Sequence, residues 1–576
     1  MARTVRWIWI ALLVIAVALR LPALNLVPLA PDETIAALGS LDATRGGGWP
    51  QTGESPLLEV GNALLFFVLG AGDGVARLLP ALAGVALVGL PFLWRKRLGE
   101  IGALVAAGLL TGSPLVLFAS RRLEATILGL LGAGLLVTAL MLVDDDAVPP
   151  RLWPALVVLG FGIGLTGGPS FYDGLLSGVG AWLFYRWASG KAIALPSRRW
   201  ARPAVEGLVV ALLISIGLGF RWSGWDGPGD GLAAWLRTWR AAGVERPGLS
   251  LLLLYEPLTL LLALLGLGLS FVRTEPFPLA LGLWGLLALL LTSLRPGASP
   301  SAFAASIIPL VLLAGCGMRR LVTGVDRGLW KWVGLHTLLG FILWLPVGLA
   351  IANHAANNTY AVAPGSAILG GFAVVVLGVL LLAALQALLS VMFSLVVPTQ
   401  VLWRDVLFGA AATLLVVQFG FAWGLAFLRP ASPAEPAVTS ATSSDVWNLR
   451  RTVDDLALSS ARSRDMVEIT VVDSDPILTA VIRWTLRDFP GLQVAASWPE
   501  ATIGVVVTPA ETMPALPDAG SWKGMRFVAT VAGAGAAPAC QQLLPPNCPD
   551  LAKWYLYRKL PTGSVVAGQV ILWGNP

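Results

Sequence analysis

Residues 7–27 read WIWIALLVIAVALRLPALNLV, and residues 28–38 directly after them read PLAPDETIAAL. The first stretch is long and apolar enough to cross a bilayer as a helix. Arg3 and Arg6 precede it, and positively charged flanks tend to stay in the cytoplasm. The acidic pair Asp32-Glu33 should therefore lie on the opposite side, at the membrane surface. The start of the chain predicts a membrane protein with carboxylates at its outer face.

The composition of the whole chain agrees with this beginning. Hydrophobic residues make up 56% and charged residues 12% of the sequence, and the mean hydropathy is +0.77. This balance excludes a soluble protein and indicates a polytopic α-helical membrane protein. The apolar runs suggest about thirteen transmembrane helices. No small-residue cleavage site follows the first run, so it should be retained. No clustered basic face suggests a nucleic-acid partner; the expected surroundings are membrane lipids.

One apolar run is too short and too polar for a span. Residues 57–69 (LLEVGNALLFFVL) carry Glu59 and Asn62, and we interpret them as a helix lying on the outer surface. With this run outside the membrane, basic loops such as 95–97 lie in the cytoplasm, as the positive-inside rule requires. The arrangement predicts a multi-pass protein of the plasma membrane with a cytoplasmic N-terminus and an extracytoplasmic C-terminus.

The character of the sequence changes after Arg429. Residues 430–445 (PASPAEPAVTSATSSD) have the composition of a linker. The remainder has ordinary polarity and suits helices at 445–462 and 476–489 and strands at 467–473, 492–498, 503–508, 526–531 and 565–573. We therefore expect a transmembrane domain over 1–429, with external loops at 28–74 and 222–249, a linker over 430–445, and an extracytoplasmic α/β domain over 446–576.

The three cysteines suggest one disulfide. Cys316 lies in an apolar span and should be a packing residue. Cys540 and Cys548 lie in a Pro-rich loop of the external domain, in a compartment that permits disulfides, and are expected to pair. Neither of the two histidines has the partners of a metal site, and no nucleotide-binding motif is present. No metal or other cofactor is expected.

The order of motifs in the first part of the chain resembles that of the GT-C superfamily of glycosyltransferases. The pieces are a first span followed by Asp32-Glu33, then Pro56 to Asn62, Gly70 to Pro80, Arg95-Lys96-Arg97, and Ser113-Pro114 to Ser120-Arg121. Protein O-mannosyltransferases and lipid A aminoarabinose transferases belong to this superfamily. The likeness covers roughly residues 1–190, and the external domain resembles tails of bacterial and archaeal members less closely. It implies an enzyme that uses a polyprenyl-phosphate-linked sugar as donor.

The resemblance implies roles for the outer carboxylates. Asp32 should deprotonate or orient the acceptor, and Glu33 should support it. A base on the acceptor suits attack on an anomeric carbon. Both acids also suit the first turn of a helix, and that alternative reading is compatible with the catalytic one.

The donor phosphate calls for nearby positive charge. Arg121 and Arg122 fit that need, although long cations at a membrane surface can also simply snorkel. Glu124 occupies the neighbourhood of a family acid, and Glu59 is a further candidate contact. The sequence departs from the aminoarabinose transferases at Ser55 and from many members of the superfamily at Gly167, where those proteins carry lysine. Either Arg45, Arg77 and the Arg121-Arg122 pair replace these cations, or activity has been lost.

Other candidate contacts lie further along the chain. The loop at 222–249 brings Trp222, Trp225 and Asp226 together, which suits either sugar stacking or an aromatic membrane anchor. Glu256, an acid within a span, is a candidate by the cost of its position. The sequence thus predicts a cell-envelope glycosyltransferase that modifies an unidentified acceptor. The alternative is a non-catalytic relative that binds or helps to translocate lipid-linked sugars.

Overall fold

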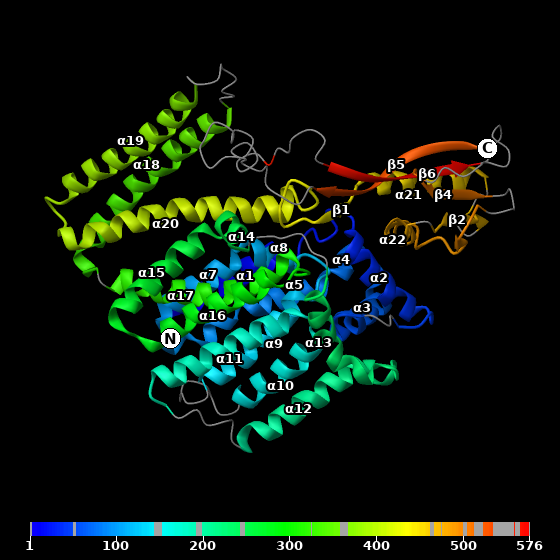
Figure 1. Ribbon diagram of the computed structural model, residues 1–576, viewed down its shortest axis with the longest axis horizontal. Helices are drawn as coiled ribbons and strands as arrows, with labels where there is room; N and C mark the ends of the chain where they lie inside the picture. Colours follow the sequence, from blue (N-terminus) through cyan, green and yellow to red (C-terminus); the bar gives the residue numbers. More distant parts are fainter. Residues whose placement is uncertain are drawn as a thin grey trace.

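The computed structural model describes residues 3–49, 53–142, 152–191, 198–241, 248–323, 325–357, 367–460, 463, 466–473, 475–498, 504–511, 522–533, 558 and 565–574. Most of this chain is helical, with one sheet near the C-terminus (Figure 1). The expected disulfide between Cys540 and Cys548 lies outside the described residues and stays a prediction. The described residues include one free cysteine, the buried Cys316.

The helical part runs from α1 to the π-helix η5. Its α-helices are α1 (Arg3–Arg20), α2 (Pro31–Thr44), α3 (Pro56–Leu69), α4 (Asp73–Ala76), α5 (Leu78–Val88), α6 (Leu90–Leu93), α7 (Arg95–Thr111), α8 (Pro114–Ser120), α9 (Thr126–Leu142), α10 (Leu152–Thr166), α11 (Ser170–Ala188), α12 (Arg198–Ser215), α13 (Gly227–Thr238), α14 (Gly248–Tyr255), α15 (Pro257–Arg273), α16 (Pro276–Leu294), α17 (Ala304–Thr323), α18 (Trp330–Asn357), α19 (Ala367–Phe393) and α20 (Thr399–Trp423). Short 3₁₀ turns are η1 (Gly217–Gly219), η2 (Gly224–Asp226), η3 (Pro300–Phe303) and η4 (Arg327–Leu329), and η5 spans Gly424–Leu428.

Several of these helices are long and apolar enough to cross a membrane. Among the described residues five meet this criterion, or seven when each of two bent pairs counts as one span. The expected count of about thirteen is not confirmed, because helices such as α9 and α10 are shorter than a straight crossing requires. The short run expected to lie on the surface does form a separate helix, α3.

Two spans are broken where a proline begins a new helix. Pro114 starts α8, which is bent by 57° from α7, and Pro257 starts α15, which is bent by 105° from α14. Proline is tolerated in the first turn of a helix but cannot continue one, so both breaks follow from the sequence. The two breaks meet, because the Ser113 hydroxyl donates a hydrogen bond to the carboxylate of Glu256.

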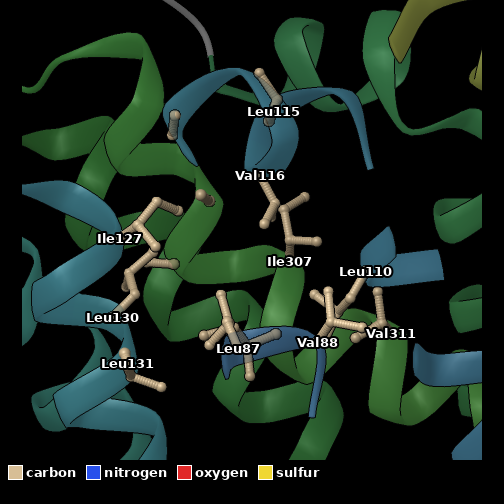
Figure 2. Packing of buried hydrophobic residues seen from close by; sticks show 14 of the residues in the cluster. Leu87, Val88, Leu110, Leu115, Val116, Ile127, Leu130, Leu131, Ile307 and Val311 are labelled. Atoms are coloured by element: carbon tan, nitrogen blue, oxygen red, sulfur yellow. The ribbon is translucent and has the colours of Figure 1, made fainter. Parts of the chain in front are cut away.

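The core of the helical part is formed around α17. Figure 2 shows Ile307 and Val311 of α17 among side chains of α5, α7, α8 and α9, for example Leu87 and Leu110. Nearly all of the apolar part of α17 is buried, whereas α18 is largely exposed. In Figure 1, α18 and α19 extend as a hairpin away from the main bundle, and α20 leads from this hairpin towards the sheet.

The C-terminal part is a mixed sheet with two helices, α21 (Asp445–Ser460) and α22 (Pro476–Thr485). Its strands are β1 (Ser440–Thr442), β2 (Ile469–Val472), β3 (Leu492–Ala495), β4 (Val505–Pro509), β5 (Lys523–Gly533) and β6 (Val565–Gly574), in the order β1-β5-β6-β4-β2-β3. β2 is parallel to β3 and β4, and the other pairs are antiparallel. The strands and helices expected from hydrophobic alternation are confirmed. β1 corrects the expected linker over 430–445, since a short stretch there joins the sheet edge.

Candidate active site

Glu33 is a structural anchor in the first turn of α2. Its Oε2 accepts a hydrogen bond from the Ala30 N–H at 2.7 Å, and the Arg77 guanidinium donates to both oxygens at 2.9 and 2.6 Å. The Leu123 N–H donates to Oε1 at 2.6 Å. Burial would raise the pKa of the Glu33 carboxyl, but the charges of Arg77 and Arg122 lower that pKa to about 2. Glu33 therefore stays ionised and ties α2 to the start of α5 and to the loop before α9.

Asp32 faces a different environment from its neighbour. Its side chain is 53% exposed, and both of its oxygens lie 2.9 Å from Nη2 of Arg122. Asp32 has no backbone hydrogen bond of the kind that fixes Glu33 among the interactions of the described residues. The carboxylate is thus held in position by one cation and still reachable from outside, which are the properties that a general base needs.

Asp32 lines a cavity of about 480 Å³, a volume within the range of small-molecule sites. The cavity forms where α2 and α3 meet the loops that precede α9 and α11 and the loop that follows α16. Its polar lining residues are Asp32, Ser40, Glu54, Ser55, Glu59, Asn62, Glu124, Thr126, Ser170, Thr238, Arg295 and Ser299. Polar groups from six segments of the chain therefore converge on one space beside the acidic pair.

Arg122 connects Asp32 to a second carboxylate in the cavity. Its Nε lies 2.8 Å from Oε1 of Glu124, and the Ser301 hydroxyl donates to the other oxygen of Glu124. Burial raises the pKa of Glu124, the charge of Arg122 lowers it, and the charge of Asp32 raises it, with a net increase. The buried guanidinium of Arg122 is therefore the common counter-ion of two carboxylates at the wall of the cavity.

The other cations expected to hold a phosphate are occupied elsewhere. Arg121 donates hydrogen bonds to the carbonyls of Leu19, Arg20, Pro22 and Ala23, so it caps the end of α1. Arg77 is committed to Glu33 and to carbonyls of residues 24–28. Arg45 is exposed and donates to the carbonyl of Arg487 in the C-terminal part.

Glu59 lines the cavity from α3. Its Oε2 accepts a hydrogen bond from Nη1 of Arg221 at 3.0 Å, and both side chains are buried. Burial raises the pKa of Glu59 to about 7, with Arg221 acting against the rise and Asp230 adding to it. The ion pair with Arg221 fixes this carboxyl at the cavity wall.

The remaining predicted contacts lie outside the cavity. Trp222 and Trp225 are exposed, with ring centroids 6.2 Å apart, and Asp226 is exposed beside them at the start of α13. Glu256 is fully buried at the break before α15, where its oxygens accept hydrogen bonds from Ser113, Thr259 and Gln418. Neither group meets Asp32 around the cavity.

Two cavity residues were not among the predicted contacts. Asn62 is 1% exposed, and neither its amide nitrogen nor its amide oxygen has a partner among the described residues. Arg295 is 3% exposed, with Nε and Nη1 equally without a partner there. Asn62 belongs to the motif beginning at Pro56, but nothing in the pattern distinguished its role. Arg295 stands alone after an apolar span, so its sequence context gave no signal of a site.

Among the ranges that the structure describes, no group of three His, Cys, Asp or Glu side chains could hold a metal ion.

Sequence comparison gives no relative, whereas comparison of folds does. No protein-family model matches the chain, and no curated protein matches it. The structure of ArnT from Cupriavidus metallidurans bound to undecaprenyl phosphate is similar, with a TM-score of 0.53 and 15% identity over 87% of this chain and 93% of that chain. Its apo structure gives a TM-score of 0.52 and 17% identity over the same shares. The Archaeoglobus fulgidus oligosaccharyltransferase AglB, in complex with an inhibitory peptide and a dolichol-phosphate, has a TM-score of 0.43 and 12% identity over 88% of this chain and 70% of that one.

At identities of 15% and 17%, the similarity to ArnT shows a shared fold. It extends over nearly the whole length of both proteins, so it includes much more than the opening motifs. The chain has the GT-C fold that the order of those motifs predicted.

Proposed function

We propose that the protein transfers a sugar from a polyprenyl phosphate carrier to an acceptor outside the cytoplasm, in the cavity beside Asp32. The observation that carries this proposal is the position of Asp32 itself. It is a half-exposed carboxylate, fixed by Arg122, at the wall of a cavity of about 480 Å³. The GT-C fold supports the same reaction class, because the ArnT structure of that fold was solved with undecaprenyl phosphate bound.

The reaction can be written with the groups at the cavity wall. Asp32 accepts the proton of an acceptor hydroxyl, whose oxygen attacks the anomeric carbon of the donor sugar. The bond between that carbon and the phosphate oxygen breaks, and its electron pair leaves with the polyprenyl phosphate. Attack and departure take place on opposite faces of the sugar, so the anomeric configuration inverts. General-base assistance of this kind contributes about 10²–10⁴ in rate.

The sugar itself needs neutral hydrogen-bonding groups. Asn62 offers one donor group and one acceptor without partners among the described residues, and it lines the cavity from α3. A buried amide left unpaired is costly, and a sugar hydroxyl can satisfy both of its ends. Asn62 is therefore the residue that we expect to contact the transferred sugar.

The alternative is a protein that binds lipid-linked sugars without transferring them. The full chain, purified in detergent or nanodiscs, should carry a polyprenyl phosphate that mass spectrometry can identify. Supplied with a polyprenyl-phosphate-linked sugar and an envelope extract as acceptor, it should release free polyprenyl phosphate. Binding without release would favour the alternative, and the absence of both would overturn the proposal.

The proposal also requires the cavity to face outwards. Single cysteines at Lys96 and Ser444 can be probed in intact cells with an impermeant thiol reagent, in a chain whose natural cysteines have been replaced. We expect labelling at Ser444 and protection at Lys96. Labelling at Lys96 alone would place the cavity on the cytoplasmic side and contradict the proposed orientation.

A further inference from the structure

A second hollow, of about 500 Å³, lies between the main bundle and the helices α18 and α20. Helices α7, α15 and α17 form its wall on the side of the bundle. Leu415 of α20 lines it and is 55% exposed, so the hollow opens sideways to the surrounding membrane. Apolar walls that face an unfilled space lose packing contacts, so a hydrocarbon chain is stabilised there. The residues that line this lateral hollow include Gly108, Leu262, Met318, Trp330, Thr337 and Leu415.

Two glycines leave room in the lateral hollow. Gly108 of α7 and Gly334 of α18 both line it, and a Cβ atom built on either would meet no atom of the described residues within 4 Å. Gly102, also in α7, has the opposite surroundings, since a Cβ there would lie 2.9 Å from the Gly315 carbonyl oxygen. The same helix therefore packs closely against α17 at one glycine and presents an open wall at the other.

The depth of the lateral hollow matches one leaflet of a membrane. Phe408 and Leu415 of α20 line it, and Arg404 is on the same helical face one turn before Phe408. The helix rises by about 16 Å from Arg404 to Leu415, and half of a bilayer hydrocarbon core is about 15 Å. Trp330 and Trp403 are partly exposed at the Arg404 end, as expected for aromatic side chains at a membrane–water interface. Arg404 therefore lies at the level of the lipid headgroups.

Arg404 has hydrogen-bonding capacity to spare at this level. Its Nε and Nη1 are buried and have no hydrogen-bond partner among the described residues. The Arg404 guanidinium lies 5.4 Å from the centroid of the Trp403 ring. The adjacent Asp405 is directed towards α18, where its Oδ2 lies 3.8 Å from Nδ1 of the buried His336. A guanidinium with unpaired N–H groups at the headgroup level suits a lipid phosphate.

The Arg404 end is also the end far from the acidic cavity. A smaller hollow of about 160 Å³ shares Gly108 with the lateral hollow and continues to Leu19 and Thr111. From there, α1 leads to the loop before Asp32, and α7 leads to α8 on the same side of the molecule. A carrier lipid whose phosphate lay beside Asp32 would enter this path from that side and leave Arg404 unpaired.

We infer that the lateral hollow binds an anionic phospholipid from the leaflet opposite to the acidic cavity, with an acyl chain in the hollow and the phosphate on Arg404. This is the leaflet that the sequence predicts to face the cytoplasm. The bound chain contacts α7, α15 and α17 on one side and α18 and α20 on the other, so it fastens these two helices to the bundle. The inference does not depend on the proposed function.

Native mass spectrometry of the full-length protein tests this inference by comparing the affinities of phosphatidylglycerol and phosphatidylcholine with identical chains. The natural chain should prefer the anionic lipid about tenfold, and Arg404→Gln should remove that preference while leaving the phosphatidylcholine affinity unchanged. Arg273→Gln is the matched control, because Arg273 is an exposed cation at the end of α15 that does not line the hollow. It should keep the preference.

A second pair of variants tests the position of the chain and does not rely on the folding of Arg404→Gln. Gly334→Leu fills the lateral hollow from α18 and should weaken the binding of both lipids about tenfold or more. Gly348→Leu is its control, since Gly348 is in the same helix, faces equally open space and does not line the hollow. It should bind both lipids normally.

Three results would overturn the inference. Equal affinities for the two lipids in the natural chain, or an undiminished preference in Arg404→Gln, would show that Arg404 does not hold the phosphate. Normal binding by Gly334→Leu would show that no chain occupies the lateral hollow. Displacement of bound phosphatidylglycerol by an equal concentration of undecaprenyl phosphate would assign the hollow to the carrier instead.

Discussion

Nη2 of Arg122 lies 2.9 Å from each carboxylate oxygen of Asp32, so one cation fixes the acid without covering it. Half of the Asp32 side chain remains exposed, whereas the Arg122 side chain is 8% exposed. The adjacent Glu33 is completely enclosed by Arg77 and by backbone N–H groups. Neighbouring acids of one helical turn thus have opposite surroundings, which gives them separable roles.

Asp32→Asn should abolish most of the transfer activity and leave folding intact. The amide keeps the size of the side chain but cannot accept the acceptor proton, so transfer should fall about a hundredfold or more. Initial rates with a defined lipid-linked sugar measure the effect. Asp455→Asn, which changes an exposed acid of α21 outside the cavity lining, is the control and should transfer normally. Near-normal rates in Asp32→Asn would remove this residue from the chemistry.

Glu33→Gln should lower the free energy of unfolding and make that free energy less dependent on pH. Removing one partner of a buried ion pair costs about 3–5 kcal/mol. The pKa of Glu33 is lowered to about 2 in the folded protein from an ordinary value of 4.5. Its contribution is therefore fully present above about pH 4.5 and is lost as the pH falls towards 2.

Thermal midpoints of the natural chain and of Glu33→Gln, measured from pH 7 to pH 3, check this expectation. The difference between the two proteins should be largest at neutral pH and should shrink on acidification. A difference that stayed constant over this range would mean that the pair with Arg77 does not carry the stability.

The fold could be predicted from the sequence more fully than the contacts of the site. The motif order predicted the fold, and hydrophobic alternation predicted nearly every strand of the C-terminal sheet. Charge alone could not separate the arginines, because a cation that caps a helix and one that lines a cavity look alike in sequence. Arg295 and Asp173 are 122 positions apart, and only packing brings them together. The count of about thirteen spans stays unconfirmed, and apolar runs do not reveal bends such as the one at Pro257.

Asn62→Leu should stabilise the fold and, at the same time, weaken binding of the donor. Leucine has a similar shape and removes two buried polar atoms without partners among the described residues, a gain of about 1 kcal/mol or more. If the amide contacts the sugar, the Michaelis constant for the donor should rise about tenfold. Asn25→Leu changes an exposed residue outside the cavity lining and should alter neither property. A stabilised Asn62→Leu enzyme with normal kinetics would show that this amide has no role in binding.

The C-terminal part holds the helix that carries Asp32. Trp484 of α22 is buried against Phe66, with ring centroids 5.8 Å apart, and its indole N–H donates to Asp73 at 2.7 Å. Arg487 stacks on the Trp484 ring and donates to the Ala71 carbonyl at 3.2 Å. In Figure 1, α22 lies beside α2, and the two helices are in direct contact. The site and the sheet are therefore mechanically connected through this tryptophan.

Trp484→Ala should detach α22 from α2, because truncating a buried tryptophan costs about 3–5 kcal/mol. Amide hydrogen exchange should accelerate in α2 and α22 together, while the core around α17 keeps its protection. Transfer should fall because Asp32 lies in the first turn of the loosened helix. Ile477→Ala, on the exposed face of the same α22, is the matched control and should change neither exchange nor rate. Faster exchange confined to α22, with α2 and transfer unaffected, would show that the C-terminal part does not position the site.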